Sequence, residues 1–376
     1  LVTDPPGARV ALHRYVIRGR RLVPEYVRDL GETPILKAPL GRGSYLLVIS
    51  APGCEDTLYP VRIERGEHWD GCPPGQHEPH PIPLPRAGDL AEGELYVPAG
   101  HAWVGGDPEA PDSLSARRVW IDGFIVDRFP ITHEQYLAHL NDLLAAGRES
   151  DAWQSCPRAH RASVASASEE LACEKGPDGR FRMKERADGE TPSLRSPVVL
   201  VSFNDAVAYA RARSEATGRH CRLLNELERE KAVRGADGRH YPWGDFFDPN
   251  WACMLQSHRT PPPRLASVDA FPGDESPFGM RGGAGNSLDL CWNEWTRQGP
   301  VIEGGRLVVT ESPPEGPGYR AVRGGGWGNV ANHCRAAGRF AVLPDHRRSA
   351  LGLRLGRSFG GAAGSPARHE RVEVSL

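Results

Sequence analysis

The sequence has no apolar stretch long enough to cross a bilayer, which takes about 18 consecutive apolar residues. No basic segment followed by an apolar one opens the chain, so the sequence predicts no secretory signal. We therefore expect no membrane span in this chain. Because it begins with Leu1 rather than Met and enters a strand-like segment at once, we expect it to be a fragment of a longer protein.

The chain also lacks an excess of charge of either sign. Its formal net charge is −2 at pH 7 and its pI is about 6.8. A field this weak does not attract a polyanion such as nucleic acid or an anionic lipid surface. We therefore expect no nucleic-acid partner.

Closely spaced cysteine pairs are missing as well. The cysteines stand at positions 54, 72, 156, 173, 221, 253, 291 and 334, without CxxC spacing. Structural zinc sites use such pairs, so zinc is not predicted. A chain of 376 residues is large enough for at least two cores and does not depend on disulfides. Free thiols are the expectation.

Residues 1–70 predict a small antiparallel β-sandwich. Alternating apolar runs are separated by turn sequences, namely Asp4-Pro5-Pro6-Gly7, Gly31-Glu32-Thr33-Pro34 and Gly41-Arg42-Gly43. The segment resembles the PEGA domain. The residues that carry this resemblance are Pro6-Gly7-Ala8, Thr33-Pro34, Gly43-Ser44-Tyr45 and Pro52-Gly53.

Three further segments differ in composition from the rest of the chain. Residues 71–92 are dense in Pro and His, which predicts an extended, semi-rigid linker at a domain boundary. Residues 149–192 have no clear period and indicate an insertion, and residues 359–376 predict a flexible tail. The histidines at positions 68, 77 and 80 fit a solvated linker better than a metal site.

Residues 93–358 form a second domain in which two helices are predicted. Thr132 is the expected N-cap of the first, and Ser202, with Asp205 in the first turn, that of the second. Apolar residues at helical spacing follow each cap, among them Tyr136, Leu137, Leu140 and Leu144 after the first and Ala206, Tyr209 and Ala210 after the second.

The same region resembles the formylglycine-generating enzyme, or sulfatase-modifying factor, family. The matching residues, in chain order, are Val97-Pro98-Ala99-Gly100, Gly105-Gly106, Pro130-Ile131-Thr132, Val201-Ser202-Phe203, Arg222-Leu223, Glu226, Glu230, Tyr241-Pro242-Trp243-Gly244, Ala284-Gly285-Asn286, Arg323-Gly324-Gly325 and Leu351-Gly352-Leu353-Arg354. The resemblance implies a loop-rich α+β variant of the C-type lectin fold with a ligand face built from C-terminal loops. The 43 Gly and 34 Pro agree with a loop-rich chain.

The resemblance also implies a chemistry, which the sequence puts in doubt. Enzymes of this family oxidise a substrate cysteine to formylglycine with a copper ion held by two cysteine thiolates near the C-terminus. Cys334 matches the second of these thiolates, but Asn329 stands in place of the first. A neutral amide beside one thiolate is a poor ligand set for Cu(I). We therefore expect no catalytic residues, and Cys334 to be a small buried hydrophobic residue.

Two enzymatic alternatives remain open. Cys291 could fold in to supply a second thiolate, which would keep the copper oxidase. An iron-dependent enzyme that forms C–S bonds is another branch that the resemblance implies, but its histidine-rich site is not favoured because no HxxxH pair is present. The resemblance further implies a structural calcium ion, for which Asn286 and Asp289 offer hard oxygen donors. An Asn that only stabilises a turn is the equal alternative.

Two stretches depart from the pattern of the family. Leu224 and Arg229 stand where the family usually has Pro and Trp, and Leu288-Asp289-Leu290 replaces its usual Trp-Glu-Trp. These changes alter packing more than chemistry. They indicate a branch away from the enzymes.

If the chemistry is absent, the C-terminal loops still offer a binding face. The candidate ligand-binding residues are Trp327, Asn329, Asn332, His333, Arg335, Arg339, Phe340, His346 and Arg347. Arg335, Arg339 and Arg354 could instead pair with Asp345 or cap buried carbonyls. The expected ligand is a protein, a peptide or a glycan.

Two contexts fit such a face. The first is a sensory region of a bacterial signalling protein such as a serine/threonine kinase, which the PEGA-like segment favours. The second is a retroelement-diversified binding protein, in which residues of the C-terminal loops vary.

Overall fold

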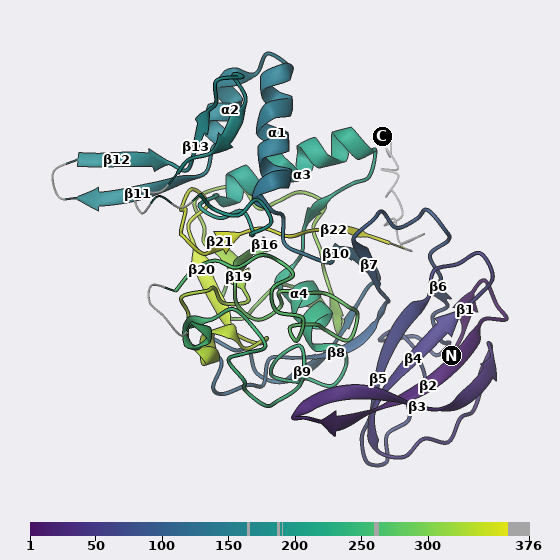
Figure 1. Cartoon of the computed structure of the whole chain (residues 1–376). Helices are drawn as coiled ribbons and strands as arrows, with labels where there is room; N and C mark the ends of the chain where they lie inside the picture. The colour runs from purple at the N-terminus through teal and green to yellow at the C-terminus, as the bar shows by residue number, and fades with distance from the viewer. Residues whose placement is uncertain (164–165, 186–188, 190, 259–262, 360–376) are drawn as a thin grey trace, which may run out of the picture.

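The computed structural model describes residues 1–359 except 164–165, 186–188, 190 and 259–262 (Figure 1). The predicted flexible tail lies outside the described residues, apart from Phe359. The helices are α1 (His133–Ala145), α2 (Glu149–Ser155), α3 (Phe203–Thr217) and α4 (Glu226–Arg234), with the 3-10 turns η1 (Leu255–Ser257) and η2 (Ala331–Cys334). Within the described part of the chain, no helix is both long and apolar enough to cross a membrane.

A four-stranded antiparallel sheet in the order β3-β2-β4-β5 forms the N-terminal domain. Its strands are β2 (Arg9–Arg18), β3 (Arg21–Glu32), β4 (Gly43–Ser50) and β5 (Thr57–Ile63). Alternate residues such as Val10 and Leu12 on β2 and Val61 and Ile63 on β5 point into one core, which is the period-2 pattern that the sequence carries.

The Pro-rich segment 71–92 packs against this sheet and does not extend away from it. Its strand β6 (Ile82–Pro83) pairs in parallel with β1 (Thr3–Asp4), and Ile82 and Leu84 are buried in the N-terminal core. The expectation of an extended linker missed these two apolar side chains, which gain more from burial than from hydration. Phe359 is also fixed, because its ring lies edge-on to Tyr96 at 4.9 Å.

The C-terminal domain is built from short strands joined by long loops (Figure 1). Three four-stranded sheets have the orders β15-β22-β10-β7, β20-β19-β16-β21 and β17-β18-β9-β8. Their strands are β7 (Glu94–Val97), β8 (Gly100–Val104), β9 (Arg117–Ile121), β10 (Phe124–Asp127), β15 (Arg222–Leu223), β16 (Leu288–Glu294), β17 (Ile302–Glu303), β18 (Arg306–Leu307), β19 (Arg320–Arg323), β20 (Arg339–Val342), β21 (Leu351–Gly352) and β22 (Leu355–Ser358).

Helices α1 and α3 begin where the capping residues predict. Thr132 forms a capping box with Gln135, and Ser202 forms one with Asp205. The two helices pack together through Tyr136 and Tyr209, whose rings stack with centroids 5.4 Å apart. Both N-cap predictions are confirmed.

The segment predicted as an insertion projects from the body of the C-terminal domain (Figure 1). After α2 it forms two antiparallel hairpins, β11–β12 and β13–β14. The strands are β11 (Arg158–Ser163), β12 (Ser166–Leu171), β13 (Cys173–Lys175) and β14 (Phe181–Met183). Its base joins the main core through buried residues such as Cys173 and Phe181.

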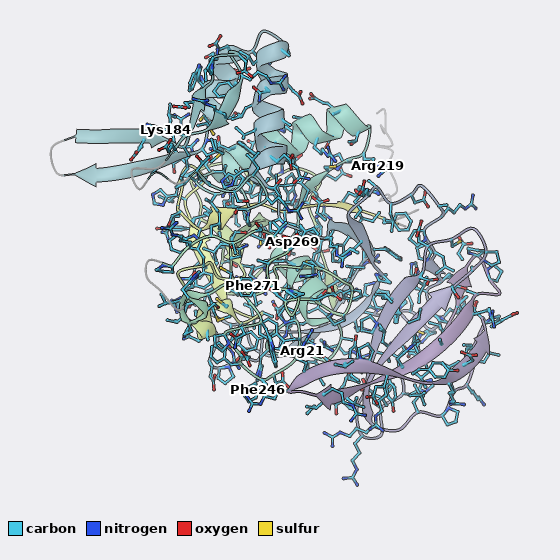
Figure 2. The ribbon with its side chains drawn as sticks, in the orientation of Figure 1. Arg21, Lys184, Arg219, Phe246, Asp269 and Phe271 are labelled. Carbon is cyan, nitrogen blue, oxygen red and sulfur yellow. The ribbon has the colours of Figure 1, made fainter. Side chains whose placement is uncertain are left out.

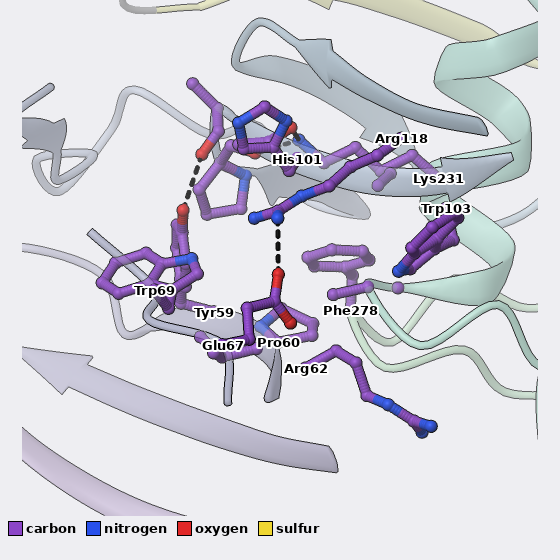
Figure 3. Close-up of a pocket in the computed structure, with 17 residues that line it drawn as sticks. Tyr59, Pro60, Arg62, Glu67, Trp69, His101, Trp103, Arg118, Lys231 and Phe278 are labelled. Carbon is purple, nitrogen blue, oxygen red and sulfur yellow. Dashed lines mark hydrogen bonds and ion pairs between the residues drawn. The ribbon is translucent and has the colours of Figure 1, made fainter. Parts of the chain in front are cut away.

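The two domains contact each other along β5 and at the tip of the β2–β3 hairpin. Figure 3 shows one contact region, where the Tyr59 hydroxyl donates to the Ala99 carbonyl at 3.1 Å and Arg118 pairs with Glu67 at 2.5 Å. At the hairpin tip, where Figure 2 labels Arg21, the guanidinium of Arg20 lies over the Phe246 ring, 4.5 Å from its centre, and that of Arg21 lies over the Trp251 ring. The Leu22 amide donates to the Trp243 carbonyl at 2.8 Å. The N-terminal domain therefore rests on the Tyr241-Pro242-Trp243-Gly244 loop.

Candidate functional site around Cys334

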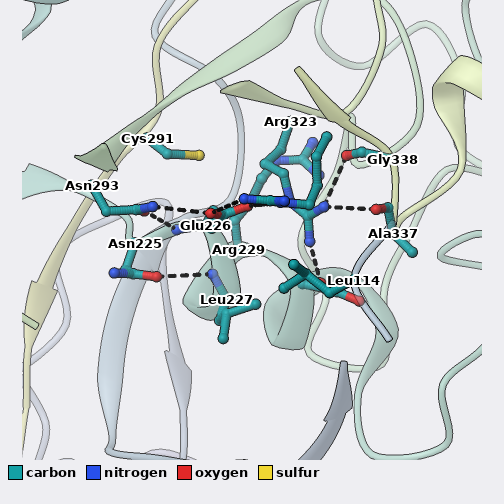
Figure 4. A network of polar contacts seen from close by, with 12 residues as sticks. Leu114, Asn225, Glu226, Leu227, Arg229, Cys291, Asn293, Arg323, Ala337 and Gly338 are labelled. Atoms are coloured by element: carbon teal, nitrogen blue, oxygen red, sulfur yellow. Dashed lines mark hydrogen bonds and ion pairs between the residues drawn. The ribbon is translucent and has the colours of Figure 1, made fainter. Parts of the chain in front are cut away.

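Helix α4 fixes the loops that form the site, and it does so through charge. All nine of its residues are buried although most of them are ionic, and Asn225 caps its first turn. Buried charges are stable only when they are paired and hydrogen bonded. Figure 4 shows the resulting polar network between α4 and the C-terminal loops.

Two arginines of the C-terminal segment complete this network. Arg339 donates to both carboxylate oxygens of Glu226, at 2.6 and 2.9 Å. Arg323 pairs with Glu230 and donates to the carbonyls of Ala337 and Gly338 at 2.8 and 2.9 Å. The loop between β19 and β20, which carries Cys334, is therefore held at both ends by buried ion pairs.

Cys334 is a fully buried residue at the end of η2. It packs in a small apolar cluster with Tyr241, Trp243, Met254 and Ala284. A Cβ atom at Gly325, whose φ is +70°, would lie only 2.6 Å from the Cys334 Sγ, so the chain passes over the thiol as closely as glycine permits. Burial is the largest of the effects that raise the Cys334 pKa far above its ordinary value, so the thiol stays neutral.

Asn329 is occupied in shaping the turn before η2. Its side-chain Oδ1 accepts a hydrogen bond from the Gly326 backbone N–H at 2.8 Å, and its backbone N–H donates to the Gly326 carbonyl at 2.9 Å. Its carbonyl accepts from the Leu255 amide at 2.9 Å. The side-chain oxygen of Asn329 is therefore used to form this turn.

The thiol of Cys253 contributes to raising the Cys334 pKa, after burial and the charge of Asp274. Cys253 Sγ contacts the Arg264 carbonyl at 3.5 Å and His258 Nε2 at 3.8 Å, while Cys291 Sγ contacts the Asp289 carbonyl at 3.6 Å. Burial raises the Cys253 pKa to about 12. Within the described ranges, no three His, Cys, Asp or Glu side chains are grouped so as to hold a metal ion. The amide oxygen of Asn329, a hard donor that accepts from the Gly326 amide, does not suit Cu(I), which prefers thiolates.

All eight cysteines are free thiols in the structure.

Three of the arginines predicted to bind a ligand form internal ion pairs, which is the alternative that the sequence leaves open for Arg335 and Arg339. Arg339 is paired with Glu226, as described above. Arg335 bonds Asp107 at 2.6 Å and Glu109 at 3.0 Å, and Arg347 bonds Asp205 at 2.7 Å. Burial of a guanidinium requires such a carboxylate, so these three side chains support the face without being available on it.

Five predicted residues remain at the surface of the loops, and we call them the loop face: Trp327, Asn332, His333, Phe340 and His346. Asn332 and His346 are exposed, and the other three are half-buried. The rings of His333 and Phe340 meet edge to face at 5.5 Å, and Trp327 Nε1 donates to the Ser349 carbonyl at 3.0 Å. Aromatic rings held in this way present a preformed surface.

This arrangement of loops and sheets can be compared with known proteins. Residues 82–359 match the model of the sulfatase-modifying factor enzyme 1-like domain. The chain belongs to this family. The match covers the whole C-terminal domain, including α4 and the loop face.

Relatives in this family include enzymes and a protein described as inactive. The chain is 28% identical to a formylglycine-generating enzyme of Thermomonospora curvata over 73% of its own length and 96% of that protein. It is also 28% identical to the inactive Cα-formylglycine-generating enzyme 2 of Mus musculus. That alignment of 310 residues covers 71% of this chain and 86% of the mouse protein.

A third relative, the serine/threonine-protein kinase Pkn1 of Chlamydia trachomatis, is 25% identical over 70% of this chain and 38% of the kinase.

Among solved structures, PvdO from Pseudomonas aeruginosa superposes with a TM-score of 0.52 at 21% identity, covering 71% of this chain and 94% of PvdO. This likeness supports the fold alone, which is the loop-rich, C-type-lectin-like α+β architecture that the resemblance implied.

The two residues considered for calcium have most of their side-chain polar atoms engaged by the protein, and Asp289 Oδ1 is the one that has no hydrogen-bond partner among the described residues. The Asn286 side chain accepts a hydrogen bond at Oδ1 from the Ala266 backbone N–H at 2.9 Å, and its Nδ2 donates to the Ala266 carbonyl at 3.0 Å. Asp289 Oδ2 accepts from Arg229 at 2.8 Å and from Arg354 at 3.4 Å. Two guanidinium groups stand where a cation would need to be, so this pair does not fit a calcium ion.

The sequence does not reveal the partners of the buried arginines. Asp345 is the carboxylate that the sequence suggests, whereas the actual carboxylates come from α3, α4, β16 and residues 107–109. One part of that expectation is correct, because Arg354 does cap the buried carbonyls of Asp127 and Arg128, at 3.0 and 2.9 Å. The sequence signal for these pairs was the set of three acidic residues Glu226, Glu228 and Glu230. A helix with so many carboxylates can be buried only if arginines elsewhere in the chain pair with them.

Proposed function

We propose that this chain is a non-catalytic, ligand-binding region of a bacterial signalling protein. The observation that carries the proposal is the state of the position that corresponds to the first metal-binding cysteine. There, Asn329 closes a turn on Gly326, and the remaining thiol of Cys334 packs in an apolar cluster with Tyr241 and Met254. A redox metal has no pair of soft anions to bind, so the family's oxidation chemistry has no starting point.

The loop face is the proposed binding surface. It combines two aromatic side chains, Trp327 and Phe340, with the adaptable polar groups of Asn332, His333 and His346. Aromatic anchors beside hydrogen-bonding groups suit a protein, a peptide or a glycan. The buried ion pairs beneath the face favour recognition by a rigid surface, because little order has to be gained on binding.

A sensory role in a kinase-like protein is supported by two observations. One relative is a bacterial serine/threonine kinase of which this chain covers 38%. In addition, the N-terminal domain, which we propose to be PEGA-like, contacts the Trp243 loop through Leu22, and Trp243 packs in the same cluster as Cys334. The loop that carries Trp243 therefore contacts both the N-terminal domain and the apolar cluster around Cys334.

A titration with Cu(I) in the presence of a competing thiol chelator tests the absence of oxidase chemistry. We expect the wild type and C334A to bind copper equally weakly, and neither to consume oxygen with a cysteine-containing peptide. Comparison with C334A separates this position from adventitious binding at the half-exposed Cys54 and Cys72. Stoichiometric binding that disappears in C334A, together with oxygen consumption, would restore the enzyme.

The loop face is tested separately by capture of ligands from glycan and peptide arrays. We expect W327A and F340A to lose any captured ligand, and a variant of an exposed residue far from the face, R18Q, to retain it. Equal binding by all three proteins would place the ligand elsewhere.

A further inference from the structure

A cavity of about 450 Å³ lies on another part of the C-terminal domain, between α1, α3 and the sheet strands β10 and β22. Figure 2 marks its rim near the end of α3, where Arg219 is labelled. Its volume is within the range of about 300–1,000 Å³ that is usual for small-molecule sites. The loop face contributes none of the residues that line it.

The polar lining contains two opposite charges that the protein does not pair. Asp127 at the end of β10 and Arg213 on α3 both line the cavity, yet within the part of the chain that is described neither forms an ion pair. Asp127 is held by a hydrogen bond with the Leu355 backbone. The Tyr209 hydroxyl, on the same wall, has no hydrogen-bond partner among these residues.

The neighbouring acid, Glu94, also lines the cavity, but unlike Asp127 it is paired with residues of the protein. It accepts from Arg357 at 2.7 Å, from Arg219 at 3.1 Å and from the Ala91 amide at 2.8 Å. These contacts satisfy Glu94 completely and leave it without a role in binding. Asp127 has no comparable set, although burial is costly for an unpaired carboxylate.

Burial is the largest cause that raises the Asp127 pKa, to about 7, and the nearby Glu94 raises it further. Arg354 and Arg213 act in the opposite direction. Near neutral pH the group therefore exchanges its proton readily. A bound ammonium group would favour the ionised carboxylate, so a cation should bind more tightly as the pH rises through this value.

Part of the remaining wall is apolar. Ile131, Val268 and Leu355 are buried residues on the lining, and Phe129 is half-buried beside them. A ligand that satisfies the cavity would thus carry a positive group, a negative group and an apolar part.

We propose that this cavity binds a free amino acid or a closely similar zwitterion, with its ammonium group at Asp127, its carboxylate at Arg213 and its side chain against the apolar wall. The Tyr209 hydroxyl is placed to hydrogen bond the same ligand. The site is independent of the loop face, so its failure would leave the proposed function untouched.

Isothermal titration of the full chain with each of the protein amino acids in turn tests the proposal. We expect saturable binding of at least one apolar amino acid, for which L-leucine is the first probe. Leucine amide keeps only the positive group and N-acetyl-leucine keeps only the negative one, and each should bind roughly 30-fold more weakly or worse. Absence of saturable binding by every amino acid overturns the proposal.

Variants assign the site. D127N and R213Q should each weaken binding roughly 30-fold or more, whereas E134Q, an exposed residue on the rim, should stay within about twofold. Binding to the wild type should strengthen from pH 6 to pH 8, and this dependence should be lost in D127N. Circular dichroism and thermal melting establish that each variant is folded. Binding that is unchanged in folded D127N also overturns the proposal.

Discussion

Arg229 and Asp289, two residues at which this sequence departs from its family, are bonded to each other, with Nε and Oδ2 2.8 Å apart. Arg229 replaces the usual Trp of α4, and Asp289 replaces the usual Glu of the strand that follows the Gly-Asn motif. Both side chains are buried. The two departures therefore meet in one buried ion pair.

Removing Asp289 should lower the unfolding free energy of the protein more than removing Arg229 does. Asp289 also accepts from Arg354, so its loss leaves two guanidinium groups without a carboxylate, while loss of Arg229 leaves Asp289 with one partner. We expect D289L to lose about 3–5 kcal/mol of unfolding free energy and R229M clearly less. Urea denaturation measures both. An equal or greater loss in R229M would contradict the shared role of Asp289.

Arg339 provides a test of which predicted ligand residues are structural. Because it pairs with the buried Glu226, R339A should lower the unfolding free energy by about 3–5 kcal/mol. H346A, which changes an exposed residue of the loop face, should alter it by no more than about 0.5 kcal/mol. Thermal and urea denaturation distinguish the two. A stable R339A protein would mean that Arg339 is available to a ligand after all.

The sequence predicted local structure well and long-range pairing poorly, for a physical reason. Thr132 and Ser202 announce their helices because a capping residue and its partner lie within one turn. The partner of Arg347 is Asp205, and that of Arg335 is Asp107, far away along the chain. Nothing in the local pattern of an arginine tells whether a carboxylate will meet it after folding.

The same distinction applies to the candidate site: its local features could be predicted from the sequence, and its long-range contacts could not. The substitution of a metal-binding cysteine by Asn329 could be recognised by comparison with a family pattern, and the turn that Asn329 makes with Gly326 agrees with its amide chemistry. The packing neighbours of Cys334 could not be recognised, because Tyr241, Met254 and Ala284 join its cluster from distant parts of the chain. The cavity beside Asp127 also depends on tertiary packing, and no motif in the sequence marks it.

Cys334 should behave as a packing residue and not as a reactive thiol. C334A should lose about 1 kcal/mol, because a small apolar group fills most of the same space. C334S should lose about 1–3 kcal/mol more, since its hydroxyl would be buried in the apolar cluster of Tyr241 and Trp243. Iodoacetamide should label Cys54 and Cys72 in the native protein and leave Cys334 unmodified until unfolding. Rapid native labelling of Cys334, read by mass spectrometry, would contradict this.

His101, at the contact between the two domains, should make their association sensitive to acid. Burial lowers its pKa from 6.5 to about 4, helped by the positive charges of Arg118 and Lys231, which Figure 3 draws with it, and opposed by Asp70. The unfolded chain therefore takes up a proton at a higher pH than the folded one. The stability contributed by neutral His101 is complete above pH 6.5 and is lost as the pH falls towards 4.

The difference between the wild type and H101Q isolates this effect from other titrating groups. We expect the wild type to lose stability relative to H101Q as the pH is lowered from 6.5 to 4, and H346Q, which removes an exposed histidine, to follow the wild type. Urea denaturation at a series of pH values measures the difference. If the curves of the wild type and H101Q stay parallel across this range, His101 does not titrate between the folded and unfolded states, and the contact between the domains owes nothing to its charge.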